Sequence, residues 1–320
     1  MSRKIFITQR IPDQGPTLLL EKLGADDIEY NETDGVLPKE ELIKRLQGKD
    51  IVLSLLTDTI DEELFDACPD LKMVANYAVG FNNIDLEAAK KRGIVVTNTP
   101  GVLDQTTADL AFALIMACGR ELLPADEYMR SGKYKNWEPM GFLGQDIFNS
   151  TLGIIGMGRI GKAVAERGVK GFNMKVVYAD EIEAEGLDFD VEKIPLEELL
   201  EVSDFVSLHV PLTDDTHHII SDKELELMKD TSYIINTSRG PVIDEKALYE
   251  ALKTKKIAGA GLDVYELEPE VYPGLSDLKN LIMVPHIGSA SWGTRQRMSR
   301  LASENIVDWV EGKEPRTRIA

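Results

Sequence analysis

Apolar and polar residues follow two different patterns along the first hundred positions of the chain. Short runs rich in β-branched residues stand between longer stretches in which apolar residues recur every three or four positions. The runs predict strands and the stretches predict helices, and helices between consecutive strands imply crossover connections in a parallel sheet. The predicted strands are 4–8, 28–31, 51–56, 71–78 and 94–98, and the predicted helices are 17–24, 38–48, 61–67 and 85–93.

Glycine and proline positions agree with these boundaries. Gly24, Gly48 and Gly93 each follow a helical stretch, where a C-terminal glycine is expected, and Pro38 stands where a helix is expected to begin. The first hundred residues therefore read as one alternating α/β unit.

The pattern changes after residue 101. Residues 106–132 keep helical spacing with an interruption near Pro124, and residues 133–150 are rich in aromatic residues and glycine without a clear period. A second alternating series follows, and a last amphipathic helix runs from about residue 291 to 310 and stops at Gly312. The predicted strands of this series are 152–156, 175–180, 204–210, 232–238, 258–264 and 281–285, and the predicted helices are 158–172, 195–202, 222–229 and 244–256.

Composition limits the class of protein. A chain of 320 residues is expected to form two domains, and 43% hydrophobic with 28% charged residues is typical of a soluble globular protein. The formal net charge of −19 disfavours nucleic acid and anionic membranes as partners, and a small anionic substrate would need a local cation. No segment resembles a signal peptide or a membrane span, so a cytoplasmic location is expected. Cys68 and Cys118 are expected to be buried thiols, and no metal site is expected.

A phosphate-binding loop is the most specific local motif. Gly156, Gly158 and Gly161 form G-x-G-x-x-G between a predicted strand and a predicted helix, and Asp180 ends the next strand, nineteen residues after the third glycine. This arrangement places a pyrophosphate at a helix N-terminus and a carboxylate at a ribose. Asp180 and the acidic residues after it favour NAD over NADP, because a carboxylate repels a 2′-phosphate.

His286 follows a short apolar run and a proline in LIMVPHIGSASW. A histidine in such a place is more often a packed residue than a proton carrier, and only orienting partners would make it a proton donor. Trp292, six residues later, is expected to pack in the core, although covering a substrate pocket is the alternative.

Six ordered blocks of the chain resemble the D-isomer-specific 2-hydroxyacid dehydrogenase family over essentially its whole length. The blocks are NYAVGFNNIDLEAAKKRGIVVTNTPGVL, the glycine loop with its aspartate, HVPLTDDT, MKDTSYIINTSRGPVIDEKAL, GLDVYELEP and VPHIGS. The resemblance implies two doubly wound parallel-sheet domains, with a Rossmann nucleotide-binding domain (102–287) inserted into a flavodoxin-like substrate domain (1–101 and 288–320).

The resemblance also implies a catalytic set of three residues. Arg239 matches the arginine of N-x-x-R-G, Glu268 the glutamate of D-V-x-x-x-E-P, and His286 the histidine of P-H-x-G. Chemically, reduction of a 2-oxo acid needs a carboxylate anchor and a proton donor, which a guanidinium and an imidazole can supply. Glu268 beside the imidazole would favour its protonated form.

Further positions match those with which the family contacts substrate and cofactor. The backbone near Val79 and Gly80, with Arg239 and His286, is expected to hold the substrate. The cofactor is expected to contact Gly156, Gly158, Arg159, Ile160, Gly161 and Asp180, and also Thr107, Val210, Pro211, Thr216, Thr237, Ser238, Asp263 and Gly288. Turn or core roles are equally open for the second group.

The block around Val79 most resembles glyoxylate and hydroxypyruvate reductases. A small 2-oxo acid, glyoxylate or hydroxypyruvate, is therefore the expected substrate, and NADH the expected cofactor. A 3-phosphoglycerate or D-lactate dehydrogenase within the family, and an NAD(H)-sensing corepressor-like binding protein, are the alternatives. A homodimer is implied by the resemblance, with residues 121–150 as its interface, although packing on their own domain is an open alternative. The role of Trp137 in this segment stays open.

Overall fold

A computed structural model describes residues 3–32 and 35–320 of the chain. The chain divides into two compact units, the first made of Met1–Leu103 with Ser289–Ala320 and the second of Asp104–Gly288. The predicted boundaries at 101/102 and 287/288 lie beside these divisions, and the predicted role of the first unit in substrate binding stays a prediction. The predicted substrate domain includes Met1, Ser2, Thr33 and Asp34, which lie outside the described residues.

The first unit is built on a five-stranded parallel sheet. Its strand order is β2-β1-β3-β4-β5, the flavodoxin-like order in which the chain reverses direction across the sheet between β1 and β3. The strands are β1 (Ile5–Ile7), β2 (Ile28–Tyr30), β3 (Ile51–Ser54), β4 (Met73–Asn76) and β5 (Val95–Thr97). All four pairings are parallel, as the alternation of strands and helices predicted.

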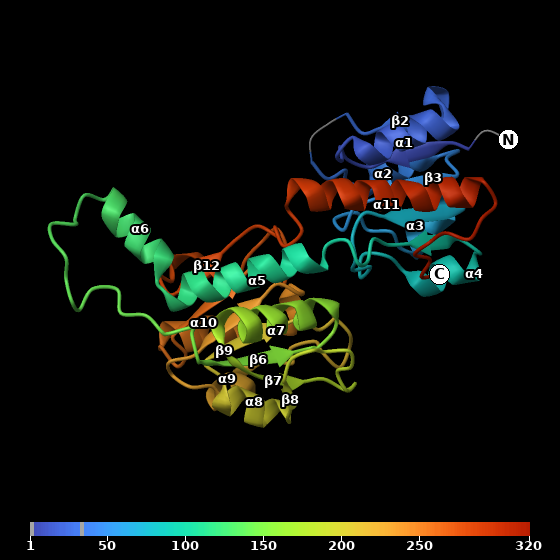
Figure 1. Ribbon diagram of the computed structural model, residues 1–320. Coiled ribbons are helices and arrows are strands. Elements are labelled where there is room, and N and C mark those ends of the chain that lie inside the picture. The colour runs from blue at the N-terminus through green and yellow to red at the C-terminus, as the bar shows by residue number, and fades with distance from the viewer. Residues whose placement is uncertain (1–2, 33–34) are drawn as a thin grey trace. The chain divides into compact units, whose positions relative to one another are not determined.

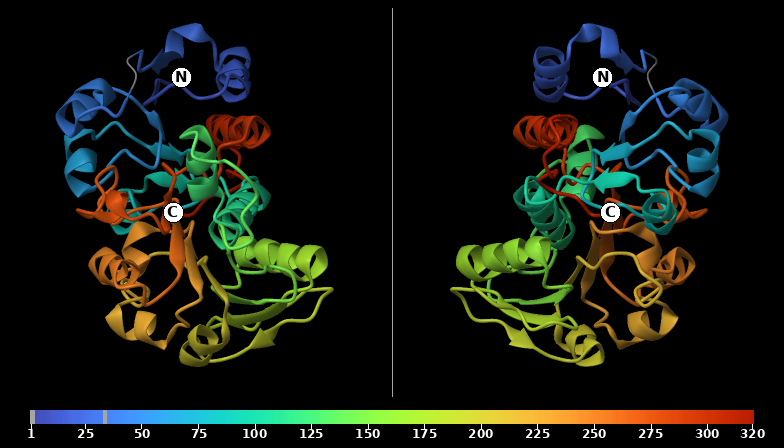
Figure 2. Two further views of the ribbon diagram at one scale, coloured as in Figure 1. Left: turned by 90° about the vertical axis from the view of Figure 1, so that its left-hand side faces the viewer. Right: turned by 90° about the vertical axis from the view of Figure 1, so that its right-hand side faces the viewer.

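Helices cover both faces of this sheet. On one face, apolar side chains of α2, α3 and α4 join those of the strands in one core. Helices α1 and α11 pack against each other, and α11 contacts β3 and β4 (Figures 1 and 2). The helices are α1 (Gln14–Leu23), α2 (Lys39–Leu46), α3 (Glu62–Ala67), α4 (Leu86–Lys91) and α11 (Trp292–Val310), with a short 3₁₀ turn, η1 (Ala25–Asp27).

The second unit is built on a seven-stranded parallel sheet of order β12-β11-β10-β9-β6-β7-β8. Counted from β6, this is the Rossmann order 3-2-1-4-5-6 with one further strand, and the direction of winding reverses between β6 and β9. The strands are β6 (Thr151–Ile155), β7 (Lys175–Ala179), β8 (Glu192–Lys193), β9 (Phe205–Leu208), β10 (Tyr233–Asn236), β11 (Gly259–Leu262) and β12 (Leu281–Met283).

Two apolar cores, one on each face, hold the helices of the second unit to its sheet. Helices α5 and α7 lie on one face, and α8, α9 and α10 lie on the other. The segment after α5, which begins with α6, extends away from the sheet (Figure 1). The helical elements are α5 (Asp104–Gly119), α6 (Leu122–Arg130), α7 (Arg159–Phe172), α8 (Leu196–Val202), α9 (Asp222–Leu227), α10 (Glu245–Lys253), η2 (Gly240–Val242) and η3 (Leu275–Asp277).

Three features differ from the sequence-based prediction. The long helix predicted over residues 106–132 is two helices, and the break comes at Glu121, whose φ is +48°, three residues before the proline held responsible. The two-residue strand β8 was not predicted, because it is too short to show a period. The expected core packing of Trp292 is wrong, since this side chain is 82% exposed at the start of α11.

Other expectations are confirmed. Cys68 and Cys118 are both buried free thiols. Gly24, Gly48 and Gly93 follow α1, α2 and α4 with positive φ values, and Pro38 is the N-cap of α2. Over residues 3–32 and 35–320, no helix has the length and apolar character needed to cross a bilayer.

Candidate active site

The glycine loop after β6 holds three glycines in three different surroundings. At Gly156, whose φ is +93°, an added Cβ would lie 2.8 Å from the backbone of His209 and Val210. At Gly161, on the first turn of α7, it would lie 2.2 Å from the Gly156 carbonyl oxygen. At Gly158, the N-cap of α7, it would meet no atom of the described residues within 4 Å. The first and third glycines let the chain pack on itself, and the second leaves open space where a helix N-terminus favours an anion.

Asp180 lies at the carboxyl end of β7, beside this loop. One carboxylate oxygen accepts the Met157 N–H at 2.7 Å, and the other accepts the Ile182 N–H at 2.9 Å. The first bond ties the carboxylate to the residue between Gly156 and Gly158. The structure therefore brings together the loop and the carboxylate that sequence reasoning paired.

The other predicted cofactor residues lie at the carboxyl ends of neighbouring strands or beside them. Val210 and Pro211 follow β9, and the Pro211 carbonyl oxygen accepts the Thr216 hydroxyl at 2.5 Å. Arg159 is exposed and pairs with Asp104 at 3.2 Å, whereas Ile160 packs into the core under α7. Thr107, on α5, is buried, and a Cβ added at Gly288 would lie 3.3 Å from its methyl carbon. These contacts are with the protein itself, so a cofactor role for these residues stays a prediction.

The turn after β10 is shaped by Asn236. Its side-chain oxygen accepts the Ser238 N–H at 3.0 Å and the Ser238 hydroxyl at 2.8 Å, and its amide donates to the Arg239 carbonyl oxygen at 2.8 Å. The Thr237 hydroxyl is buried and finds no hydrogen-bond partner among the described residues. A buried hydroxyl without a partner is uncommon, and an oxygen or nitrogen of a bound ligand would satisfy it.

Arg239 follows in this turn and is half-buried, and its guanidinium donates to the Ser238 carbonyl oxygen at 2.6 Å. The next residue, Gly240, faces the backbone of the segment after β11, because an added Cβ would lie 1.9 Å from the Tyr265 carbonyl group. Only glycine permits this approach, which ties the Arg239 turn to the loop that carries Glu268.

Glu268 and His286 form a hydrogen-bonded pair. A carboxylate oxygen of Glu268 lies 2.9 Å from His286 Nδ1, and its other oxygen accepts the Tyr265 N–H at 3.0 Å. The two side chains are 30% and 28% exposed, so solvent or a ligand can reach them. Because Glu268 engages Nδ1, proton transfer to a substrate has to use Nε2.

The backbone at His286 is left-handed, with φ of +52°, and Asp263 stabilises it. The Asp263 carbonyl oxygen accepts the His286 N–H at 2.9 Å. Its carboxylate oxygens accept the N–H groups of Ile287 at 2.6 Å and Gly288 at 2.8 Å. Left-handed backbone is uncommon for residues other than glycine and is frequent at functional sites. In this structure Asp263 therefore contacts the histidine turn, whereas the prediction assigned it to a nicotinamide contact.

The pKa values of the charged groups reflect burial and their neighbours. Burial alone would raise the pKa of Glu268, but the hydrogen bond and charge of His286, the Tyr265 N–H and the charge of Arg239 lower it from its ordinary value. Burial lowers the pKa of Arg239, and the charge of Glu268 opposes that shift. Burial raises the pKa of Asp263, while the Ile287 N–H, the His286 charge and the Gly288 N–H oppose it. A group of side chains with shifted pKa values at one edge of a sheet is typical of active sites.

In the first unit, the turn at Val79 and Gly80 follows β4. The Asn98 side-chain amide donates to the Val79 carbonyl oxygen at 2.8 Å, and the Asn76 amide donates to the Gly80 carbonyl oxygen at 2.9 Å. Two asparagines thus hold the turn through its carbonyl groups. The predicted contact of its N–H groups with a substrate stays a prediction.

Sequence reasoning did not assign roles to Asn236, Gly240 or Tyr265, although Asn236 and Gly240 lie inside the quoted N-x-x-R-G motif. Asn236 shapes the arginine turn, Gly240 permits the approach of the next loop, and the Tyr265 N–H orients Glu268. The motif itself is the only signal in the sequence, because each role depends on a segment distant in the chain. Within residues 3–32 and 35–320, no group of three or more His, Cys, Asp or Glu side chains is arranged to hold a metal ion.

Comparisons with known proteins agree over nearly the whole chain. Residues 112–288 match the family model described as "D-isomer specific 2-hydroxyacid dehydrogenase, NAD binding domain". A glyoxylate reductase of Korarchaeum cryptofilum is 50% identical over 320 residues, which cover 98% of this chain and 95% of the relative. A crystal structure of a glyoxylate reductase from Paecilomyes thermophila is 32% identical with a TM-score of 0.88, covering 99% of this chain and 98% of that one.

A second solved structure adds information on the cofactor of a relative. It is an NADPH-dependent glyoxylate/hydroxypyruvate reductase from Sinorhizobium meliloti in complex with citrate. It is 31% identical to this chain with a TM-score of 0.85, and the match covers 99% of this chain and 98% of that one.

Proposed function

The chain belongs to the D-isomer specific 2-hydroxyacid dehydrogenase family, and from that premise we propose that it reduces a small 2-oxo acid to its D-2-hydroxy acid. Glyoxylate and hydroxypyruvate are the favoured substrates, since the relatives at 50%, 32% and 31% identity carry those names. The observation that carries the proposal is the 2.9 Å bond between Glu268 and His286 Nδ1, in the same unit as Arg239 and the glycine loop.

Each charged group has a separate task in this proposal. Arg239 binds the substrate carboxylate, because a guanidinium offers two parallel N–H donors to a carboxylate. His286 Nε2 donates a proton to the carbonyl oxygen in reduction and takes it back in oxidation. Glu268 holds the imidazole through Nδ1, which leaves Nε2 to face the substrate. A contact of the Val79 and Gly80 N–H groups with the substrate carboxylate stays a prediction from the family resemblance.

The glycine loop, Asp180 and the Thr237 hydroxyl would hold a nicotinamide dinucleotide, which supplies the hydride when bound. The open space at Gly158 fits a pyrophosphate, and the unpaired Thr237 hydroxyl fits a polar group of the ligand. Thr107, Arg159, Ile160, Val210, Pro211, Thr216, Ser238, Asp263 and Gly288 complete the proposed cofactor contacts.

NADH is the proposed cofactor in preference to NADPH. Asp180 stands where a ribose is expected, and Glu181, Glu183 and Glu185 follow it, so a 2′-phosphate would meet several negative charges. The related enzyme from Sinorhizobium meliloti is NADPH-dependent, so both cofactors have to be measured.

Asp180→Ala should raise the KM for NADH about tenfold or more. Glu181→Ala removes the same charge one residue away and serves as the control.

One substrate panel tests the proposal. Purified protein is mixed with NADH, and then with NADPH, and with glyoxylate, hydroxypyruvate, pyruvate or phosphohydroxypyruvate, while the absorbance of the reduced nicotinamide is followed. Turnover with glyoxylate or hydroxypyruvate and NADH is expected. Higher kcat/KM with pyruvate or phosphohydroxypyruvate would instead assign a D-lactate or 3-phosphoglycerate dehydrogenase. Tight NADH binding without turnover of any of the four acids would contradict the reductase and favour an NAD(H)-sensing binding protein.

A homodimer is the proposed assembly, and the segment from α6 to β6 its interface. Large apolar side chains gather there at high exposure, an arrangement typical of a covered surface. They are Leu122, Leu123, Met129, Tyr134, Trp137, Met140, Phe142, Leu143 and Phe148. Light scattering should report twice the chain mass, and Trp137→Glu with Met140→Glu should shift it to the monomer. A wild-type monomer would remove this role from the segment. A cytoplasmic location stays a prediction, and the lack of nucleic-acid partners stays one that rests on the net charge.

A further inference from the structure

Glu245 is a carboxylate that the proposed reaction does not use, yet it is buried. It occupies the first position of α10 and is 3% exposed. Burial raises the pKa of Glu245. The N–H groups of Glu266 and Tyr272 lower it, and the nearby charges of Glu266 and Glu268 raise it further. Because a buried carboxylate is costly unless hydrogen bonds satisfy it, its partners indicate what it contributes.

The two partners of Glu245 are the two ends of the loop that carries Glu268. One carboxylate oxygen accepts the Glu266 N–H at 2.9 Å, and the other accepts the Tyr272 N–H at 3.0 Å. A single side chain therefore bridges residues 266 and 272, and Glu268 lies between them. The bridge ties the loop to α10, which packs in the core of the second unit.

Glu266 reinforces this bridge from the opposite direction. One of its carboxylate oxygens accepts the Glu245 N–H at 3.4 Å, and the other is hydrogen-bonded to His218 Nε2. His218 also donates its backbone N–H to the Pro241 carbonyl oxygen at 2.8 Å. Pro241 belongs to η2, which follows Arg239 directly. The group of Glu245, Glu266 and His218, named here the loop clamp, thus connects the Glu268 loop with the segment after Arg239.

We propose that the loop clamp, and Glu245 above all, positions Glu268 for its bond with His286, so that Glu245 is a positioning residue for proton transfer. The inference rests on the proposed function, because positioning matters only if His286 transfers a proton. Glu268 is directly held by one backbone bond, from the Tyr265 N–H, and the rest of its placement comes from the loop. Without the bridge the loop would relax, and the carboxylate would leave Nδ1.

Glu245→Gln tests this with a minimal change of shape, because the amide offers one acceptor where the carboxylate offers two. We expect kcat with the 2-oxo acid to fall about 10- to 100-fold, the range that displacement of a catalytic group by about 1 Å produces. The dissociation constant for NADH should change less than about threefold, because the glycine loop joins β6 and α7 whereas Glu245 lies on α10. Amide hydrogen exchange of a peptide spanning residues 266–272 should become faster.

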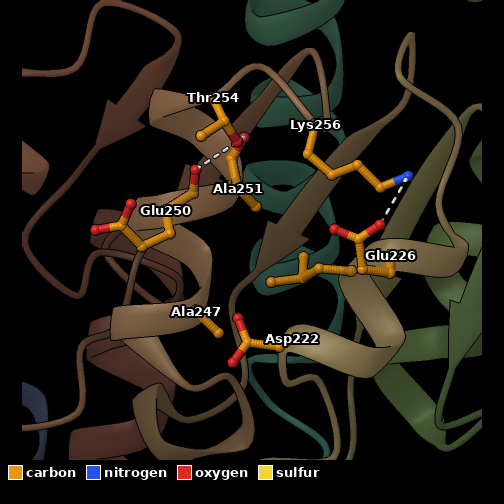
Figure 3. Close-up of a pocket in the computed structure, with 8 residues that line it drawn as sticks. Asp222, Glu226, Ala247, Glu250, Ala251, Thr254 and Lys256 are labelled. Atoms are coloured by element: carbon orange, nitrogen blue, oxygen red, sulfur yellow. Dashed lines mark hydrogen bonds and ion pairs between the residues drawn. The ribbon is translucent and has the colours of Figure 1, made fainter.

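Glu250→Gln is the matched control. Glu250 lies on the same helix as Glu245 but is exposed, lining a surface pocket between α9 and α10 (Figure 3). The substitution removes the same charge, and both kcat and the exchange of residues 266–272 should stay at the wild-type values. If Glu245→Gln does not fold, Glu266→Gln tests the same clamp at a half-exposed residue, with a smaller loss of kcat expected in the same direction.

The results separate this inference from the proposed function. A kcat within about twofold of wild type in Glu245→Gln, or equal losses in kcat and NADH binding, would overturn the positioning role. Absence of turnover in the wild type would contradict the proposed function alone. In that case hydrogen exchange decides the clamp, because unchanged exchange of residues 266–272 in Glu245→Gln would overturn it and faster exchange would support it.

Discussion

The carboxyl-terminal edges of the two parallel sheets differ in how exposed their charged side chains are. After β1 and β3 of the five-stranded sheet, Asp58 is 2% exposed and accepts the Thr8 hydroxyl at 2.5 Å and the Leu55 N–H at 2.7 Å. At the corresponding edge of the seven-stranded sheet, Glu268 and His286 are 30% and 28% exposed, and Gly158 borders open space. Around Asp58 the first edge is closed to solvent, whereas at the second edge Glu268 and His286 stay accessible and Gly158 borders open space.

The difference shows that doubly wound topology by itself does not make a catalytic site. Both sheets bring the carboxyl ends of their strands to one edge, where ligands of such sheets bind. At Asp58 one carboxylate oxygen accepts both the Thr8 hydroxyl and the Leu55 N–H, and the other is buried without a partner among the described residues. At His286, Glu268 holds Nδ1, and in the proposed reaction Nε2 transfers the proton. The two edges therefore differ in the accessibility of their charged groups, because Asp58 is enclosed whereas Glu268 and His286 can be reached by solvent or a ligand.

The largest expected effect comes from removing the imidazole at the second edge. His286→Ala should lower turnover about 10²- to 10⁴-fold, the usual contribution of a general acid or base, with NADH binding nearly unchanged. Stopped-flow measurement of NADH oxidation and the fluorescence of bound NADH give the two quantities. Near-normal turnover in the variant would remove His286 from the mechanism and with it the contrast between the edges.

An intermediate effect should separate the two kinds of glycine in the loop. Gly161→Ala should destabilise the protein by about 1–3 kcal/mol, because the new Cβ would lie 2.2 Å from the Gly156 carbonyl oxygen. Gly158→Val should leave Tm almost unchanged, because the space there is open, but should weaken NADH binding about tenfold or more.

Thermal unfolding and NADH titration of both variants measure these effects. Equal losses of stability in the two variants would mean that the space at Gly158 serves packing, and the second edge would then resemble the first.

The smallest effect should appear in the pH dependence of stability, where the two edges have opposite signs. The pKa of Glu268 is lowered, so its contribution is present above its ordinary value of 4.5 and is lost as pH falls through the folded-state value. Burial raises the pKa of Asp58, although the Leu55 N–H and the Thr8 hydroxyl oppose it. Stability from Asp58 therefore falls as pH rises above its ordinary value of 3.8.

Asp58→Asn should remove the destabilisation that the buried carboxylate adds as pH rises above about 4, a change of a few degrees in Tm. Glu268→Gln should remove a decline on the acidic side. Melting curves of both variants and the wild type, recorded at pH values below and above about 4, show how each carboxyl group changes Tm with pH. Parallel curves for the Asp58 variant and the wild type would contradict a raised pKa at Asp58.

Much of the fold followed from local patterns. Within residues 3–32 and 35–320, strand and helix alternation identified eleven of the twelve strands and a parallel arrangement, because burial on both faces leaves a strong apolar run. β8, with two residues, has no such run, and the break at Glu121 is a backbone conformation that the apolar spacing does not encode. Trp292 was misassigned because an aromatic residue near a helix start is usually packed, whereas here it is exposed.

The sequence by itself determined the two alternating units and the glycine loop with Asp180, since periodicity and motif spacing are local properties. The resemblance of six sequence blocks to a known family pointed to Arg239, Glu268 and His286, whose catalytic roles stay a proposal. Only the tertiary structure decided how those side chains are held: Gly240 against Tyr265, and Glu245 across residues 266–272. The physical reason is that a buried backbone N–H must find an acceptor, and which side chain reaches it depends on how distant segments pack.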